Sequence, residues 1–389
     1  MIYIASVVVY ILPVLFFFKS NLLKILLLTL SYPIALIFLL AYDVDLGRII
    51  SSLGLNYYSD HLKHAHYLTS LSYFIVLCIF WSCKKKTFSL KVLTLGNFER
   101  AIIFLFFLAI AFIAFPRAMG ISDIRYNLLP GSWGGVFNVL SIILIYTARR
   151  SKDIFTILVY LIIAKCFISG ERADTSIAIL LAFMLKNDNG VIKERSIGII
   201  KFMVLCAVAV CTGVLVGAYR TGVNYTNAFD YLISSIFGIG TVVDVIHVYL
   251  SSLWYVDKYG NNVDAVFNII YTIIPFVDGG GVSSDYNFTW LLKNEINNVG
   301  GGLFYTPFYL AFSDFGMLLF IVAYFYFVRY SFFSSNYFVK YIFVILIVMQ
   351  CRIQWYGMTY PFTAIKLMLM LVLIISLLKK ISGVQKYER

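Results

Sequence analysis

A series of long apolar segments, separated by short polar ones, is the feature that most limits how this chain can fold. A helix that crosses a bilayer needs about 20 apolar residues. Several of the segments are shorter, so we expect their polar flanks to extend the helices. The segments are 2–18, 25–42, 67–83, 101–116, 135–147, 154–169, 174–185, 197–218, 305–328, 338–350 and 362–378.

This pattern predicts an all-α, polytopic integral membrane protein with about 11–13 transmembrane helices. The count is a range because two further apolar segments, 231–250 and 263–277, can either span the bilayer or form re-entrant hairpins. The composition agrees, since 61% of the residues are hydrophobic and 13% are charged, against about 25% charged residues in a soluble protein. A charge at the centre of a spanning helix costs about 2.5–3.5 kcal/mol, so charges are confined to the loops.

The distribution of basic residues predicts the orientation. Lys and Arg accumulate in cytoplasmic loops, and the segments that we assign to the cytoplasm hold 19 of them against five acids. The opposite connections hold nine basic residues against fourteen acids, so the C-terminus is expected in the cytoplasm and the N-terminus outside. The net charge of +12 therefore does not indicate nucleic-acid binding, because the sequence has no soluble basic domain that could bind a nucleic acid. The cytoplasmic segments are 19–24, 84–100, 148–153, 186–196, 329–340 and 379–389.

The chain divides into three parts on this map. Residues 1–218 form an N-terminal bundle of transmembrane helices, and residues 305–389 form C-terminal transmembrane helices with a basic cytoplasmic tail. Residues 219–304 between them form one large external loop region, which holds the two ambiguous apolar segments. Glycine triplets flank residues 283–298, so we expect that segment to fold as a flexible external lid.

Five basic residues near the outer ends of the helices are not explained by topology. Arg172, Arg220 and Arg352 stand at helix ends, and Lys165 and Lys366 lie about a turn inside spanning segments on the same side. Ionisable groups within a membrane usually face a cavity and mark function. Together they suit a ligand with phosphates at headgroup depth, such as a polyprenyl diphosphate. The alternative is that each side chain snorkels to the headgroups.

Acidic and aromatic residues accompany these cations on the outer side. Glu171 is next to Arg172, and Asp314 lies inside an apolar run, in Ala311-Phe-Ser-Asp-Phe-Gly316. A carboxylate in such a place can serve as the base for a sugar hydroxyl. The alternative is a simple ion pair or a helix cap. Trp355 is expected on the same side, where it can stack against a sugar ring.

The sequence predicts no metal site and no cofactor. Asp43 and Asp45 have the spacing of ligands for a divalent cation, but acids at a helix end are more often solvated caps. His61, His64 and His66 are residues of a metal-binding type without enough acidic partners nearby. The chain also lacks a Gly-x-x-x-x-Gly-Lys motif, so a nucleotide cradle and an ATP-driven pump are not supported.

Three short motifs together resemble the bacterial O-antigen and capsule polymerases, the Wzy-type oligosaccharide repeat-unit polymerases. They are Gly170-Glu-Arg172 at a helix junction, Tyr219-Arg220 at the opening of the external loop, and Asn298-Val-Gly-Gly-Gly302 leading to the segment that contains Asp314. The resemblance covers the second half of the chain best, and the first half matches in hydropathy.

The resemblance implies a multi-pass glycosyltransferase of the bacterial inner membrane that acts at the periplasmic face. A growing glycan would be transferred from undecaprenyl diphosphate to a lipid-linked oligosaccharide repeat unit. The bilayer and the lipid-linked oligosaccharide are the expected partners, with a chain-length regulator protein as a further candidate. On this interpretation Asp314, Arg220 and Arg172 are catalytic, and Arg352, Lys165, Lys366, Glu171 and Trp355 bind substrate.

Three alternatives belong to other classes. A lipid-linked-oligosaccharide flippase would share the composition, but it would have short loops on both sides, unlike the 219–304 region. An O-antigen ligase is expected to use a histidine of its large external loop, where His247 is the only candidate and lies in apolar sequence. A non-catalytic scaffold gives no reason for the external cations.

Overall fold

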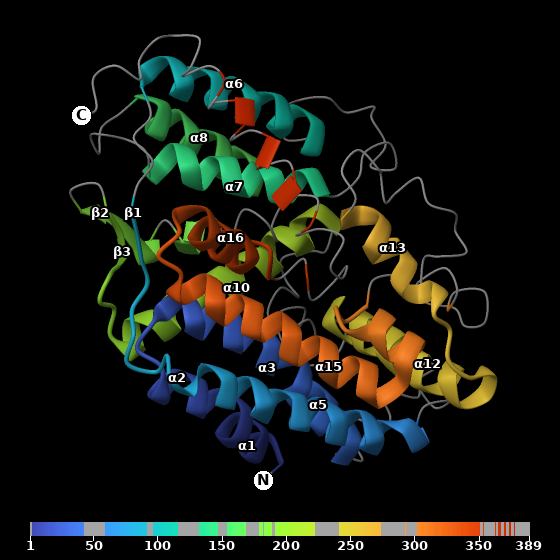
Figure 1. Cartoon of the computed structure of the whole chain (residues 1–389). Coiled ribbons are helices and arrows are strands. Elements are labelled where there is room, and N and C mark those ends of the chain that lie inside the picture. Colours follow the sequence, from blue (N-terminus) through green and yellow to red (C-terminus); the bar gives the residue numbers. More distant parts are fainter. Residues whose placement is uncertain are drawn as a thin grey trace.

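Most described residues of the apolar segments lie in helices in the computed structural model (Figure 1). The described residues are 2–42, 59–91, 96–115, 132–146, 154–168, 179–181, 183–188, 191–221, 241–273, 292, 302–350, 353, 362, 365–366, 369–370, 373–374 and 377. The helices are α1 (Ile2–Ser6), η1 (Val7–Ile11), α2 (Leu12–Phe17), α3 (Asn21–Tyr42), α5 (Ser59–Trp81), α6 (Asn97–Ala114), α7 (Ser132–Tyr146), α8 (Ile154–Ile168), α10 (Ile199–Thr221), α12 (Thr241–Tyr259), α13 (Asp264–Ile273), α15 (Thr306–Phe333) and α16 (Tyr337–Val348).

Four helices in the described part of the chain are long and apolar enough to cross a membrane: α3, α5, α6 and α15. Shorter apolar helices accompany them, among them Ile154–Ile168 and Ile199–Leu215. Polar flanks do extend the helices, as expected, because α5 begins at Ser59 rather than at residue 67. The chain is thus mostly helical, and its apolar helices indicate a multi-pass membrane protein. The count of 11–13 crossings stays a prediction.

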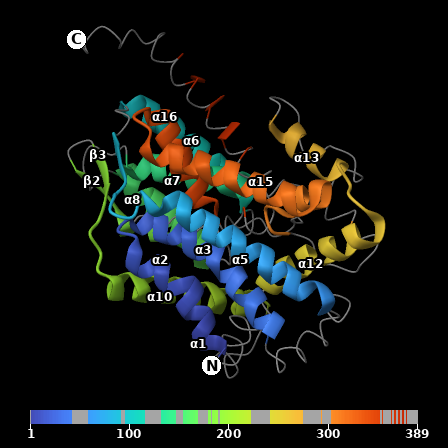
Figure 2. The ribbon, with the colours of Figure 1, turned by 60° about the horizontal axis from the view of Figure 1, so that its bottom comes forward.

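The helices form two groups (Figure 2). In one group, α5 packs against α3 and α15, and α12 packs against both α5 and α15. The other group consists of α6, α7 and α8, with the rings of Phe107 and Phe137 stacked 4.7 Å apart. Helix α16 contacts α15, α3 and α7 and therefore joins the two groups.

A small three-stranded sheet corrects the all-α prediction. Strands β1 (Ser89–Lys91), β2 (Leu185–Asp188) and β3 (Val191–Glu194) pair antiparallel in the order β1-β3-β2. Leu90, Leu185 and Ile192 are buried, whereas lysines on the opposite face are exposed. Strands of three or four residues with one or two apolar positions are too short to stand out from a polar loop, which is why hydropathy missed them.

The sheet gathers segments that the charge pattern assigns to one side of the membrane. Lys19 donates its amide to the Lys84 carbonyl at 2.7 Å, and Lys340 donates its ammonium to the Ser89 carbonyl at 2.7 Å. Described parts of 19–24, 84–100, 186–196 and 329–340 therefore meet at one end of the molecule, on the left in Figure 1, which we call the sheet end. The side of the membrane that this end faces stays a prediction.

A distant strand caps the start of α3 at the sheet end. The Ser20 hydroxyl accepts a hydrogen bond from the Leu23 amide, as an N-cap residue does. The Glu194 carboxylate accepts hydrogen bonds from the Ser20 hydroxyl at 2.6 Å and from the Leu22 amide at 3.2 Å. Burial raises the pKa of Glu194, and these hydrogen bonds oppose the rise. The α3 start thus depends on a residue far along the chain.

Helix α15 reverses direction at Phe312 and Ser313, where the backbone leaves the helical region. The rings of Phe308 and Phe320 stack at 3.6 Å, although twelve residues of straight helix would separate them by about 18 Å. The first turns of α15 therefore fold back on residues 314–333, which extend about 30 Å as a helix. The sequence predicts Asp314 inside an apolar run. In the structure Asp314 instead begins the long helix.

The external region is described only in part. Helices α12 and α13 overlap the two ambiguous apolar segments, and α13 as described covers ten residues, which is about 15 Å and shorter than a bilayer core. The expected lid at 283–298 lies outside the described residues apart from Leu292. Asp43 and Asp45 also lie outside them.

Candidate functional site

A polar site lies at the end of the helices opposite the sheet, where α5 begins and α15 reverses. Helix α5 lies beside residues 314–333 of α15, as the edge-to-face rings of Phe80 and Phe325 show nearer the sheet end. The connection between α12 and α13 closes the site from another direction (Figure 1). Helices α5, α12 and α15 and the connection after α12 therefore supply its residues.

His64 and Asp314 form the centre of this site. The His64 Nε2 atom lies 3.0 Å from the Asp314 Oδ1 atom, and both side chains are 48% exposed. His64 projects from the second turn of α5, and Asp314 is the first residue after the reversal in α15. A carboxylate held by a histidine and open to solvent can accept a proton from a bound hydroxyl group.

The connection after α12 holds the reversal in place. The Ser313 hydroxyl donates to the Asn261 Oδ1 atom at 2.6 Å, and the Asn262 amide donates to the Leu310 carbonyl at 2.8 Å. The reversal frees carbonyl groups such as that of Leu310 from their helical partners, so an outside donor is needed. Gly260, with a φ of 82°, turns the chain into this position.

Buried tyrosines lie beneath the reversal. The ring of Tyr249 meets those of Tyr305 and Tyr309 edge-to-face at 5.2 and 6.0 Å. The Tyr249 hydroxyl donates to the Met317 sulfur at 3.4 Å. This packed layer fixes the backbone on which Asp314 stands.

The last turns of α12 present aromatic rings next to the site. Trp254 and Tyr259 lie 5.9 Å apart, and the Lys258 ammonium is 4.6 Å from the first ring and 4.7 Å from the second. Tyr259 is exposed and directly precedes the connection that holds Ser313. Exposed rings with a nearby polar group provide surfaces on which a sugar can stack.

The structure places the predicted site residues unevenly. Asp314 is at the centre of the site, but half exposed. Lys165 is exposed in the last turn of α8, which packs with α6 and α7 and thus belongs to the other helix group. Lys366 is half-buried, and Arg220 is placed by its backbone alone in the last turn of α10. Arg172, Glu171, Arg352 and Trp355 lie outside the described residues.

Sequence reasoning missed the role of His64. The three histidines were considered as metal ligands, yet in the structure His64 and His66 have different partners. The His66 Nε2 atom is 2.8 Å from the Tyr10 hydroxyl, which also lies 2.7 Å from the Ser70 hydroxyl. The available signal was position: His64 stands near the start of α5, on the side of the membrane that the sequence predicts for Asp314.

Comparisons with family models, with curated proteins and with solved structures give no match to this chain. Its function therefore has to be argued from the site itself.

Proposed function

We propose that the chain is a periplasmic-face glycosyltransferase of the bacterial inner membrane, an O-antigen or capsule polymerase. The observation that carries the proposal is the His64–Asp314 hydrogen bond at the reversal of α15. It supplies a proton acceptor at the end of a bundle of apolar helices, where a lipid-linked sugar would present its hydroxyl groups.

The proposed reaction needs few parts. The hydroxyl oxygen of the acceptor sugar attacks the anomeric carbon of the donor glycan. The bond from that carbon to the diphosphate breaks, and undecaprenyl diphosphate leaves with the electron pair. Asp314 takes the hydroxyl proton, and His64 holds the carboxylate in position. No nucleotide is required, because the lipid diphosphate already activates the donor.

The remaining predicted residues keep supporting roles in this proposal. Arg220 and Arg172 stabilise the charge of the leaving diphosphate, since a guanidinium matches two phosphate oxygens. Arg352, Lys165, Lys366, Glu171 and Trp355 bind the lipid-linked substrates. At the end of α12, the exposed ring of Tyr259 and the half-buried ring of Trp254 are suited to stack on the acceptor sugar.

The test uses the banding pattern of lipopolysaccharide from a deletion strain complemented at matched expression. We expect Asp314→Asn to lower polymerisation at least about 100-fold, since general-base catalysis contributes about 10²–10⁴-fold. His64→Gln should cause a smaller loss. The matched controls are Asp60→Asn and His61→Gln, which change the same residue types in the first turn of α5.

The pattern also separates the alternatives. Loss of the ladder with a single repeat unit remaining is the expected result for a polymerase. Loss of every repeat unit from the deletion strain would indicate a flippase or a ligase instead. A wild-type ladder from Asp314→Asn would remove the carboxylate from the reaction.

A further inference from the structure

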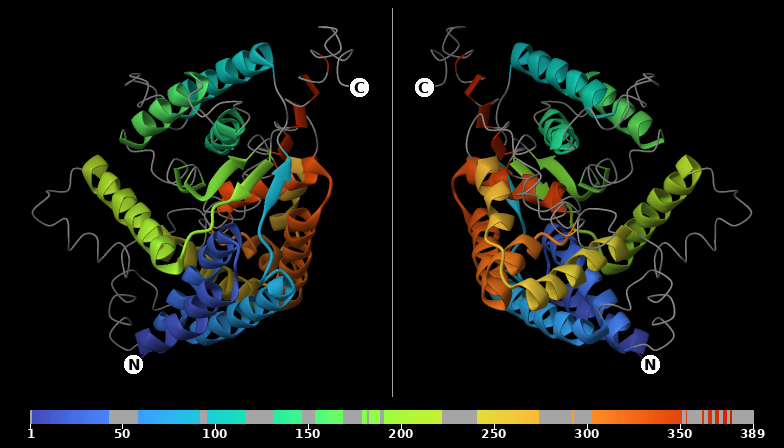
Figure 3. Two further views of the ribbon diagram at one scale, coloured as in Figure 1. Left: turned by 90° about the vertical axis from the view of Figure 1, so that its left-hand side faces the viewer. Right: turned by 90° about the vertical axis from the view of Figure 1, so that its right-hand side faces the viewer.

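Helix α10 stands at the edge of the molecule, between the α6–α8 group and the N-terminal helices (Figure 3). One face of its first turns is packed: Phe202 is fully buried, and the Lys24 ammonium of α3 lies 5.3 Å from the centre of its ring. The opposite face is exposed and apolar. Ile200, Val204 and Val208, spaced four residues apart on one side of the helix, are 80%, 54% and 53% exposed.

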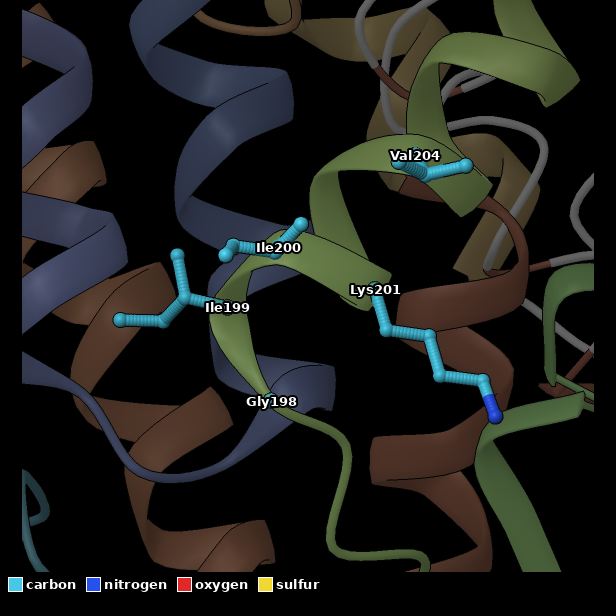
Figure 4. Close-up of a pocket in the computed structure, with 5 residues that line it drawn as sticks. All are labelled: Gly198, Ile199, Ile200, Lys201 and Val204. Atoms are coloured by element: carbon cyan, nitrogen blue, oxygen red, sulfur yellow. The ribbon is translucent and has the colours of Figure 1, made fainter.

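A shallow pocket of about 640 Å³, wide open to its surroundings, lies where this apolar face begins. It is lined by Gly198, Ile199, Ile200, Lys201 and Val204 (Figure 4). Figure 4 shows the Lys201 side chain extended on the same side of the helix as Val204, with its ammonium farthest from the axis. The walls of the pocket are apolar. Lys201 contributes its methylene chain to them, and its ammonium extends away from the helix.

The cation of this pocket is uncompensated in the described part of the chain. Lys186 and Lys193, on the neighbouring strands, both pair with the Asp188 carboxylate, at 3.9 and 3.2 Å. Arg195 donates its Nε–H to the Leu185 carbonyl at 3.1 Å. Lys201 has no carboxylate partner among the described residues. An anion would therefore find an available partner at this pocket.

The depth of the pocket fits a membrane lipid. Gly198 lies between the sheet, which is polar on its exposed face, and the apolar length of α10. Lipid phosphates lie at such a boundary, and their acyl chains run into the apolar layer beyond it. Ile200, Val204 and Val208 continue from the pocket along α10 in that direction.

We propose that this pocket binds an anionic glycerophospholipid, with its phosphate at Lys201 and an acyl chain along Ile200, Val204 and Val208. The site lies at the sheet end, so it is separate from the His64–Asp314 site at the opposite end.

The experiment measures lipid binding to the purified full-length protein by native mass spectrometry. The probes are phosphatidylglycerol and phosphatidylcholine with identical acyl chains. We expect phosphatidylglycerol to bind more tightly. Lys201→Gln should weaken its binding about fivefold, the contribution of one lysine near an anionic lipid. Lys201→Arg should retain it, and Val204→Trp should block the pocket for both lipids.

Two control variants make the result specific. Lys186→Gln removes the same charge at the same end of the molecule but outside the pocket. Met203→Trp places the same indole ring on α10 outside the pocket lining. Both should bind lipid as the wild type does. Equal losses for Lys201→Gln and Lys186→Gln would overturn the proposal, because diffuse charge would explain the binding. Unchanged binding in Val204→Trp would overturn the acyl-chain pocket.

Discussion

Ser313 has a backbone conformation that residues other than glycine rarely adopt. Its φ is 56° and its ψ is −149°, a region in which a Cβ atom causes strain of about 1–3 kcal/mol. A hydrogen bond offsets part of this strain, because the Ser313 hydroxyl donates to Asn261 and connects the reversal of α15 to the residues after α12. Asp314 is aimed at His64 by the same turn of backbone.

Two substitutions at Ser313 separate the strain from the hydrogen bond. Ser313→Ala and Ser313→Gly both remove the hydroxyl, but only alanine keeps a Cβ atom. We expect the glycine variant to be more stable than the alanine variant by about 1–2 kcal/mol, after the extra entropy of unfolded glycine is included. Thermal unfolding in detergent measures the difference. An alanine variant that equals or exceeds the glycine variant would show that residue 313 is not strained.

At the level of elements, the reversal in α15 depends on a glycine. A Cβ atom at Gly316 would lie 2.7 Å from the Phe308 carbonyl oxygen and would collide with the Phe312 Cβ atom. Neither neighbour is the free end of a flexible side chain. Gly316 thus allows the first turns of α15 to close against the long helix, which gives this glycine a packing role.

Gly316→Ala should therefore destabilise the protein, although alanine favours a helix over glycine by about 1 kcal/mol. The Cβ atom of alanine would push residue 316 away from Phe308 and Phe312. We expect this to lower the free energy of unfolding by about 1–3 kcal/mol net, as other overpacking substitutions do. The control is Gly198→Ala, where an added Cβ atom meets nothing within 4 Å. Thermal midpoints of the two variants decide the matter, and a Gly316→Ala midpoint at or above that of Gly198→Ala would contradict the packing argument.

Elements differ in how far the sequence could predict them. Apolar helices follow from local composition, so most were predicted, and α10 was expected at 197–218 and is found at 199–221. The break in α15 was hidden, because it lies in one apolar run and depends on Asn261. The His64–Asp314 pair joins residues 250 positions apart. No local pattern reports such a pairing, and without related sequences it could only be seen in the folded chain.

At the scale of the whole molecule, the two ends differ in charge and in chemistry. The sheet end carries lysines from several segments, and the opposite end carries the His64–Asp314 site. The positive-inside rule predicts that the sheet end faces the cytoplasm. Every residue assigned to the proposed reaction would be on the wrong side of the membrane if this orientation were reversed.

Single cysteines can determine the orientation. Lys63→Cys and Lys186→Cys place exposed thiols at the two ends of the molecule, in a background without the six native cysteines. A membrane-impermeant maleimide added to spheroplasts with an intact inner membrane should label the first and spare the second. After permeabilisation it should label both. The opposite pattern in intact spheroplasts would invert the topology.

The hydrogen bond between Ser20 and Glu194 has a consequence for biogenesis. Its partners are 174 residues apart, and a ribosome adds about 5–20 residues per second. About 9–35 s therefore pass between the synthesis of the start of α3 and that of the strand that caps it. During this time the intervening helices enter the membrane one after another. During that interval the first helices have to be sheltered by the insertion machinery or by lipid. Translation speed across the middle of the gene thereby sets how long the nascent bundle remains open.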